Sequence, residues 1–308
     1  MNTHTLLPAE VIASFGRHYL AQDEQHTLWQ VFAKGKKHEI AVGDRIQITP
    51  SGDKQAWVVK IEPRKNLLYR SDNLRSKLFA ANIDFVFLMI AISPPFCLEL
   101  LSRTMVACAV AKIPLHLLFN KTELLAQHHT TAEHIQNELR ALVGANTPID
   151  WISLKHKPEA ATQLLAPMIR NKTILVIGQS GMGKSTLINL LDPTALATTN
   201  NISEALNTGK HTTTTIKMHR CEQFQTKLID SPGFQKFGLH HVTEKNLQEA
   251  FPEIMAIAQR CRFDDCQHAS EPHCAVKETL THGNQVTATR MNCFMNLREE
   301  IQKNAKKW

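Results

Sequence analysis

The spacing of hydrophobic and polar positions changes twice along the 308-residue chain. Residues 38–70 consist of short, partly alternating runs separated by turn sequences, which is typical of a small β-structure. From about residue 79, continuous apolar runs alternate with amphipathic stretches, and from about residue 243 the spacing is helical. We therefore predict three domains, at residues 1–78, 79–242 and 243–308.

The first part reads as a polar leader followed by a small barrel. Three short β runs are expected, at His38–Val42, Arg45–Thr49 and Gln55–Ile61. An OB-fold gives this pattern, and such barrels often bind oligonucleotides, although an SH3-like barrel would give the same pattern. Four basic residues follow, which could form an RNA-binding edge or a solvated loop: Lys60, Arg64, Lys65 and Arg70.

The second part predicts a doubly wound α/β domain. Its apolar runs suit strands that are buried on both faces of a parallel sheet, and helices are expected between them. The expected strands are Phe85–Ile92, Pro114–Phe119 and Thr173–Ile177, and the expected helices are Leu98–Ala111, Thr131–Val143 and Ser185–Leu191.

The third part predicts helices. One is expected over Val242–Ala258 and another over about Asn284–Lys306. The second helix carries a single apolar stripe, which should face a core: Val286, Met291, Phe294, Leu297 and Ile301.

A phosphate-binding motif, G-x4-G-K-[ST], lies between the strand that ends at Ile177 and the helix that begins at Ser185. Its glycines allow successive backbone N–H groups to point at phosphate oxygens. Lys184 would reach the β- and γ-phosphates, and the Ser185 hydroxyl would hold Mg²⁺. The nucleotide-contacting residues expected here are Gly178, Gln179, Ser180, Gly181, Met182, Gly183, Lys184, Ser185 and Thr186.

The base is predicted to be guanine. The strand Pro114–Phe119 is followed by Asn120, Lys121, Thr122 and Glu123, which is similar to the N-K-x-D signature of GTPases. A carboxylate there accepts two N–H bonds from the guanine edge, a pair that adenine cannot offer. Glu123 replaces the usual Asp, so we expect somewhat softer selectivity. Ser153 is a further candidate for the base site, although Leu154 departs from the Ser-Ala pattern.

Two further segments are expected near the γ-phosphate. Asp230 and Gly233 form a D-x-x-G sequence, in which Asp230 would hold magnesium through water and the Gly233 N–H would contact the γ-phosphate. In the stretch 209–215, Thr213 could complete the magnesium shell, or the threonine run could simply begin a strand. Phe234 stands where Ras-like GTPases have a water-orienting Gln, so unaided hydrolysis should be slow. His211 is the candidate catalytic residue, together with Lys184.

The order of these motifs predicts a circular permutation. In most GTPases the phosphate loop comes first and the guanine-reading loop last, whereas here Asn120–Glu123 precedes Gly178–Ser185. The γ-phosphate switch therefore leads directly into the C-terminal segment.

A compact Cys/His cluster in the third part predicts one structural zinc ion. Three thiols and one imidazole are the usual ligands of a closed tetrahedral site. They are Cys261, Cys266, His268 and Cys274, with His273 as a possible substitute for His268. An unligated buried cluster is the alternative.

The remaining composition fits a protein of a reducing, cytoplasmic compartment. There are seven cysteines, an odd number, and no secretory signal is recognisable at the N-terminus. No apolar run is long enough to span a membrane. The net charge is +7, and residues 1–78 hold 12 Lys and Arg against 8 Asp and Glu. We interpret this as two basic contact surfaces that flank a nearly neutral nucleotide-binding domain, with binding that weakens as salt rises.

Taken together, these motifs resemble the RsgA (YjeQ) family of circularly permuted GTPases. The likeness covers roughly residues 38–300 and includes Val42-Gly43-Asp44, Pro94-Pro95-Phe96 and Gly209-x-His211-Thr-Thr. The resemblance implies an OB-fold, a permuted GTPase domain and a zinc-binding helical domain. It also implies binding to the small ribosomal subunit and its rRNA, subunit-stimulated GTP hydrolysis and a role in late subunit maturation. The switch-segment histidine is the catalytic residue proposed for that family, which matches His211.

The sequence thus predicts a cytoplasmic GTPase that uses GTP, Mg²⁺ and one Zn²⁺ and is a monomer in solution. Two alternatives remain open. One is an RNA-binding assembly factor that binds GTP but barely hydrolyses it, and the other is a P-loop ATPase or kinase with relaxed base choice.

Overall fold

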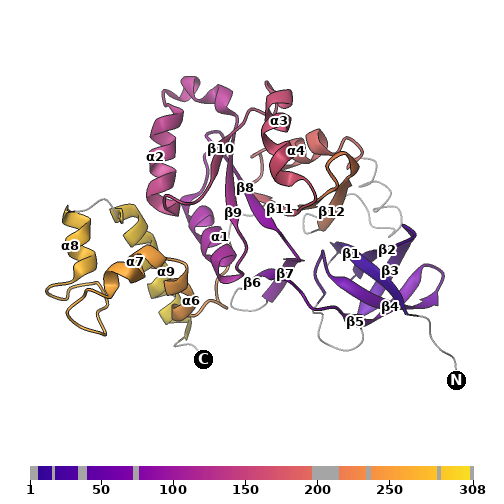
Figure 1. The fold of residues 1–308 in the computed structure, drawn as a ribbon, viewed down its shortest axis with the longest axis horizontal. Helices are drawn as coiled ribbons and strands as arrows, with labels where there is room; N and C mark the ends of the chain where they lie inside the picture. Colours follow the sequence, from indigo (N-terminus) through magenta and orange to yellow (C-terminus); the bar gives the residue numbers. More distant parts are fainter. Residues whose placement is uncertain are drawn as a thin grey trace.

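The computed structural model describes residues 6–15, 18–33, 40–71, 76–195, 215–233, 237–282 and 286–305. Three parts lie in a row (Figure 1). A β-barrel near the N-terminus is at one end, an α/β sheet with its helices is in the middle, and a helical part near the C-terminus is at the other end. No helix in these ranges has the length and apolar character that crossing a membrane requires.

Five strands form the barrel: β1 (Leu7–Phe15), β2 (His18–Asp23), β3 (Leu28–Ala33), β4 (Arg45–Gly52) and β5 (Gln55–Ile61). Their order is β1-β2-β3-β5-β4, and pairing of β4 with β1 closes the barrel. The prediction of a polar leader before residue 38 was therefore wrong. Apolar residues of these strands turn inward, so that Val11, Tyr19 and Val31 are buried in the barrel core.

The predicted strand at His38–Val42 was also wrong over the residues that can be assessed. Residues 38 and 39 lie outside the described ranges, and Ile40–Val42 form no strand beyond one isolated bridge from Val42 to Ala80. That bridge leads to a hairpin of β6 (Leu67–Ser71) and β7 (Ser76–Ala81), which connects the barrel to the central sheet.

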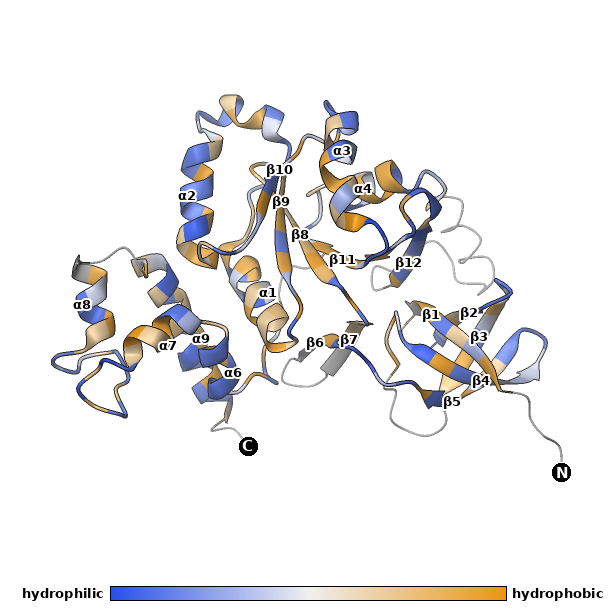
Figure 2. Ribbon diagram, viewed as in Figure 1, coloured by the Kyte–Doolittle hydropathy of each residue, from blue (hydrophilic) through white to orange (hydrophobic). Residues whose placement is uncertain are grey.

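The central sheet contains β8 (Phe85–Ala91), β9 (Leu115–Asn120), β10 (Ile149–Trp151), β11 (Thr173–Gly178), β12 (Ile216–Cys221) and β13 (Thr226–Asp230). Their order is β10-β9-β8-β11-β13-β12. All neighbours are parallel except β12, which runs antiparallel to β13. The central strands are among the most hydrophobic segments of the ribbon (Figure 2), as expected for strands covered on both faces.

Helices cover both faces of this sheet. Alternate residues of β8 enter two different cores, which places α1 (Leu98–Val110) and α2 (Ala132–Val143) on one face and α3 (Pro158–Ile169) and α4 (Lys184–Leu191) on the other. Short 3-10 turns, η1 (Thr122–Leu124), η2 (Ala126–His128) and η3 (Glu222–Phe224), follow β9 and β12. The strands and helices that the sequence predicts for this central part are present, whereas β10, β12 and α3 are additional.

The barrel and the central sheet form one continuous sheet, which the sequence did not predict. Strand β1 pairs antiparallel with β12, with Ala13 opposite Lys217. Glu10 of β1 reinforces this junction, because its carboxylate lies 2.5 Å from Arg220 and 2.6 Å from Lys227.

The C-terminal part consists of α6 (Glu244–Glu249), α7 (Pro252–Ala258), α8 (Ala275–His282) and α9 (Ala288–Ala305). The single helix expected over Val242–Ala258 is in fact two helices. Proline lacks a backbone N–H and suits the first turn of a helix, and Pro252 accordingly begins α7. The apolar stripe of the last helix is buried as predicted.

Candidate functional site: a nucleotide pocket and a Cys/His cluster

A cleft of about 700 Å³ opens at the carboxyl ends of β9, β11 and β13. Loops that follow parallel strands meet at this edge of a sheet, where open α/β sheets bind their ligands. The cleft is lined by Asn120, Lys121, Glu123, Leu124, Leu154, Lys155, His156, Ser180, Gly181, Gly183, Lys184, Ser185, Thr186, Asp230 and Gly233. Two loops distant in the sequence, the N-K-x-E loop and the phosphate loop, therefore face one cavity.

The phosphate loop curls tightly between β11 and α4. Gly183 has a φ of 103°, and a Cβ at this position would lie 2.3 Å from Nδ2 of Asn120. Only glycine combines this backbone angle with this close approach. Gly233 fits equally closely, because its Cβ would lie 2.9 Å from the backbone nitrogen of Ser180. The D-x-x-G segment thus lies directly against the phosphate loop.

Lys184 and Asp230 form the charged floor of the cleft. The Lys184 ammonium donates hydrogen bonds to the carbonyl oxygens of Gly178 (2.9 Å) and Gln179 (3.0 Å). Burial lowers the pKa of Lys184, and the nearby Asp230 carboxylate partly opposes this shift. Burial raises the pKa of Asp230 to about 6, although the positive charges of Lys184 and Lys217 act in the opposite direction.

One buried oxygen of Asp230 has no hydrogen-bond partner among the described residues. A buried carboxylate oxygen without a partner is costly, and this one lies on the wall of a cleft that also contains the Ser185 hydroxyl. Oxygen ligands of this kind suit Mg²⁺, which usually keeps several of its waters. The residues present therefore fit a magnesium ion that accompanies a bound phosphate.

Asn120 joins the two loops of the cleft. Its side-chain amide donates to the carbonyl oxygen of Met182 (3.0 Å), and its side-chain oxygen accepts from the backbone N–H of Leu154 (3.2 Å). The neighbouring Lys121 has a positive φ, and its ammonium donates to the carbonyl oxygen of Ser93.

A hydrogen bond from Ser153 orients the Glu123 carboxylate. The Ser153 hydroxyl donates to Oε2 of Glu123 at 2.5 Å, and Nε2 of His156 lies 3.8 Å from Oε1. Ser153 is buried and does not line the cleft, whereas His156 does. Neither His156 nor Lys155 belongs to a recognisable signature, so nothing in the sequence indicates their place in the cleft.

Three of the nine residues expected to contact the nucleotide from the phosphate loop do not line the cleft. Gly178 ends β11, Met182 is buried in the core beneath the loop, and the Gln179 side chain accepts a hydrogen bond from the backbone N–H of Cys97. His211, Thr213 and Phe234 lie outside the described residues, so their predicted roles stay predictions.

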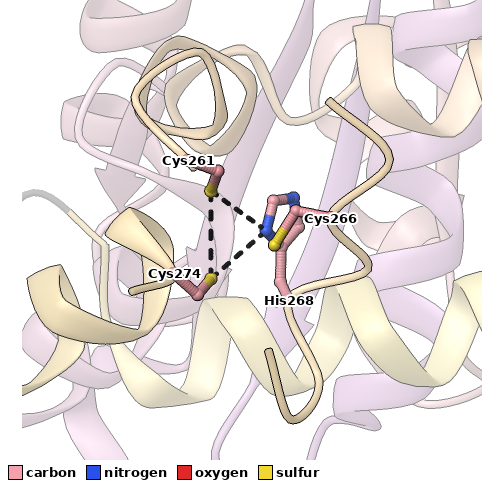
Figure 3. Close-up of side chains that lie close together, drawn as sticks. All are labelled: Cys261, Cys266, His268 and Cys274. Atoms are coloured by element: carbon pink, nitrogen blue, oxygen red, sulfur yellow. Dashed lines mark hydrogen bonds between the residues drawn. The ribbon is translucent and has the colours of Figure 1, made fainter. Parts of the chain in front are cut away.

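The four expected metal ligands lie together in the C-terminal part (Figure 3). The ligand atoms of Cys261, Cys266, His268 and Cys274 are all within 4.8 Å of one another. Sγ of Cys261 is 3.9 Å from Sγ of Cys274 and 3.7 Å from Nδ1 of His268. A tetrahedral zinc site with its usual bond lengths requires sulfur–sulfur separations of about 3.8 Å. The cluster therefore fits zinc, and the exposed His273 is not part of it.

The fold and the cleft define a circularly permuted P-loop GTPase. The phosphate-loop strand β11 lies in the middle of the sheet but comes after β8 and β9 in the chain. A model of the RsgA GTPase family matches residues 61–240. The chain belongs to the RsgA GTPase family, and it is a GTP hydrolase.

Relatives agree with this assignment. The small ribosomal subunit biogenesis GTPase RsgA of Paraburkholderia phymatum is 42% identical over 274 residues, which are 89% of this chain and 85% of the relative. The protein of the same name from Burkholderia pseudomallei is 42% identical over 94% of this chain and 91% of its own.

Two crystal structures share the fold. YjeQ from Thermotoga maritima matches 97% of this chain and 99% of its own, with a TM-score of 0.69 and 22% identity. YloQ, described as a circularly permuted GTPase, matches 98% of both chains, with a TM-score of 0.67 and 24% identity.

Proposed function

We propose that this chain binds GTP with Mg²⁺ in the cleft, hydrolyses it to GDP and phosphate when it is bound to the small ribosomal subunit, and acts late in the maturation of that subunit. The observation that carries the proposal is the convergence of the N-K-x-E loop, the phosphate loop and the D-x-x-G segment on one cavity. The names of the relatives supply the ribosomal context.

The base would lie against the N-K-x-E loop. Glu123 would accept the two N–H groups of the guanine edge, with Ser153 orienting the carboxylate from behind. Asn120 would hold the loop against the phosphate loop, and the apolar stem of Lys121 would pack on the base. A carboxylate that is already oriented by a hydrogen bond loses little freedom when the base arrives.

The phosphates would lie over the loop from Gly178 to Thr186. Its backbone N–H groups and the start of α4 provide a site for anions. Lys184 would exchange its two carbonyl partners for phosphate oxygens, and Ser185, Thr213 and Asp230 would surround the magnesium ion. The Gly233 N–H would contact the γ-phosphate.

Hydrolysis would depend on the subunit because Phe234 cannot orient a water molecule. His211 is the proposed catalytic residue. We expect His211→Ala to lower subunit-stimulated turnover by about 100-fold, with GTP affinity close to that of the wild type. The exposed His128 on η2 offers a control variant, His128→Ala. Unchanged turnover in His211→Ala would remove this residue from the mechanism.

The three predicted domains, at residues 1–78, 79–242 and 243–308, would divide these tasks. The barrel would contact rRNA, the central part would bind GTP, and the helical part would be stabilised by one zinc ion. We also propose that the protein is located in the cytoplasm, where small ribosomal subunits are found, and that it is a monomer when it is free.

Co-sedimentation with purified small subunits tests the proposal. With a non-hydrolysable GTP analogue the protein should pellet with small subunits, whereas with GDP most of it should stay in the supernatant. Large subunits are the matched control. The proposal would be contradicted if the protein pelleted equally with small and large subunits, or equally with the GTP analogue and with GDP.

A further inference from the structure

The outer surface of the barrel carries aromatic side chains where polar ones are expected. In a closed barrel, inward residues fill the core and outward residues face solvent. On β5, Ala56 and Val58 point inward and are buried. The outward residues between and after them are Trp57 and Val59, which are 41% and 49% exposed.

Trp57 is one end of a row that crosses three neighbouring strands. It pairs with Phe32 in the parallel ladder of β3 and β5, and the two ring centroids are 5.7 Å apart. The ring of His18 on β2 lies 6.2 Å from that of Phe32, edge to face. We call His18, Phe32 and Trp57 the aromatic row. Trp57 and His18 are exposed, so among the described residues this row does not pack against the central sheet.

The chemistry of the row suits flat, unpaired bases. Aromatic rings on a barrel surface stack with bases regardless of sequence, and a base contributes about 1–3 kcal/mol in this way. The surroundings favour a polyanion. Lys54 and Lys60 are exposed at the two ends of β5, although Lys60 also pairs with Glu62 at 2.8 Å. Over residues 1–78, Lys and Arg outnumber Asp and Glu by 12 to 8.

We propose that the aromatic row is a stacking platform for unpaired bases of single-stranded RNA. The proposal rests on the proposed contact with rRNA and deepens it, because it names the kind of RNA that the barrel takes. A double helix keeps its bases stacked inside and offers the row no base faces.

The test uses the full chain and a fluorescein-labelled 12-nucleotide oligo(A) RNA, with a 12-base-pair RNA duplex for comparison. Binding is followed by fluorescence anisotropy at several salt concentrations. Trp57→Ala and Trp57→Leu should both weaken oligo(A) binding about 10-fold, because leucine is apolar but has no π face. Trp57→Phe should stay within about 3-fold of the wild type, and the dependence on salt should not change in any of them.

Leu164→Ala is the matched control, because Leu164 is 39% exposed on α3, away from the barrel. Its oligo(A) affinity should equal that of the wild type. Unstimulated GTP turnover and the melting temperature verify that each variant is folded. The proposal is overturned if the wild type does not bind oligo(A), if Trp57→Ala binds it as the wild type does, or if duplex binding falls equally.

The same variants separate this proposal from the proposed function. If Trp57→Ala no longer binds the small subunit but binds oligo(A) normally, the row contacts a ribosomal protein and the RNA proposal is wrong. If wild-type turnover is stimulated by small subunits while oligo(A) binding does not depend on Trp57, only the stacking proposal fails. If no stimulation occurs, the proposed function fails, whereas oligo(A) binding that depends on Trp57 would still support the platform.

Discussion

At the scale of single residues, Asn120 explains how two distant loops become one pocket. It belongs to the N-K-x-E loop, its amide donates to Met182 of the phosphate loop and accepts from the Leu154 N–H, and Gly183 approaches it so closely that any side chain there would collide. The sequence predicted Asn120 and Gly183 from their motifs. It could not predict that they touch, because that contact depends on the parallel pairing of β8 with both β9 and β11.

Glu123→Gln tests which base the cleft reads. The amide can accept only one of the two guanine N–H bonds, and its NH₂ group would oppose the other. We expect the affinity for GDP to fall about 100-fold, since hydrogen bonds to charged groups contribute about 1.5–3 kcal/mol. Xanthosine diphosphate, which has a carbonyl group in place of the guanine amine, should bind the variant better than the wild type.

Titration calorimetry with GDP, xanthosine diphosphate and ADP measures this. Glu138→Gln, an exposed change on α2, is the control. If Glu123→Gln binds GDP as tightly as the wild type, Glu123 does not read the base.

Other residues at the site could not be predicted because their role depends on packing. Ser153 was predicted as a candidate for the base site, but its hydrogen bond to the Glu123 carboxylate was not predicted. Lys217 belongs to no motif, yet its charge acts on Asp230 because the two residues are paired across β12 and β13. The sequence shows which residues carry charge, whereas the register of the strands decides which charged residues lie close together.

At the scale of elements, the strands β8, β9 and β11 of the central sheet and the helices α1, α2, α4 and α9 could be predicted from periodicity, whereas β10 and β12 could not. The barrel strands β1 to β3 could not. The register of β1 against β2 shifts between Val11 and Ala13, which interrupts the alternation on which a strand prediction depends. The pairing of β1 with β12 joins residues about 200 positions apart, and no local signal specifies such a contact.

The contact between His241 and the β6–β7 hairpin should depend on pH. The His241 ring lies 4.1 Å from that of Tyr69, and its Nδ1 is 2.8 Å from the Ser71 hydroxyl. Burial, with a smaller contribution from His240, lowers the pKa of His241 to about 4. The unfolded chain therefore binds this proton more readily, so stability is fully present above about pH 6.5 and is lost as pH falls toward 4.

His241→Gln should reduce the loss of stability between pH 7.5 and pH 5, as read from urea midpoints at the two values. His134→Gln, on the exposed face of α2, should leave the loss unchanged. An identical pH dependence in His241→Gln and the wild type would show that this contact is not pH-sensitive.

Arg290 of α9 should hold the C-terminal part to the central part. Its guanidinium lies 2.6 Å from the Glu253 carboxylate, donates to the Leu142 carbonyl oxygen at 2.7 Å and lies 4.4 Å from the Phe251 ring centre. Its side chain is 7% exposed. Arg290→Ala would leave Glu253 and that carbonyl without their partner, so we expect a loss of about 2–3 kcal/mol.

The urea midpoint measures this loss. Arg262→Ala removes an exposed arginine from the same part and should change stability by less than about 0.5 kcal/mol. A similarly small effect of Arg290→Ala would contradict the predicted role of Arg290.

At the scale of the whole molecule, Phe237, four residues after Gly233, contacts both the β6–β7 hairpin and α1. Phe237 stacks on Phe79 of the hairpin with ring centres 5.5 Å apart, and its carbonyl oxygen accepts a hydrogen bond from Arg103 of α1. Arg103 also pairs with Glu300 of α9. The permutation places Phe237 shortly after the nucleotide pocket, so we expect a change at the γ-phosphate to reach the β6–β7 hairpin directly and the helical part through Arg103.

The helical part should depend on its metal. We expect about one zinc per chain by elemental analysis, and Cys266→Ser should lose it and lower the melting temperature by at least about 5 °C, because metal binding and folding are coupled. Cys293→Ser changes a cysteine of α9 outside the cluster and should retain the zinc. A metal-free protein that melts like the wild type would disprove a structural zinc.

The rate of GTP hydrolysis with and without purified small ribosomal subunits tests the central claim most directly. Wild-type turnover of GTP should rise at least about 10-fold when small subunits are added, since a partner that completes a GTPase site has a large effect on the rate. ATP turnover should stay low, and Lys184→Ala should show no turnover under either condition. The account would be contradicted if GTP turnover were the same with and without small subunits, or if ATP were hydrolysed as fast as GTP.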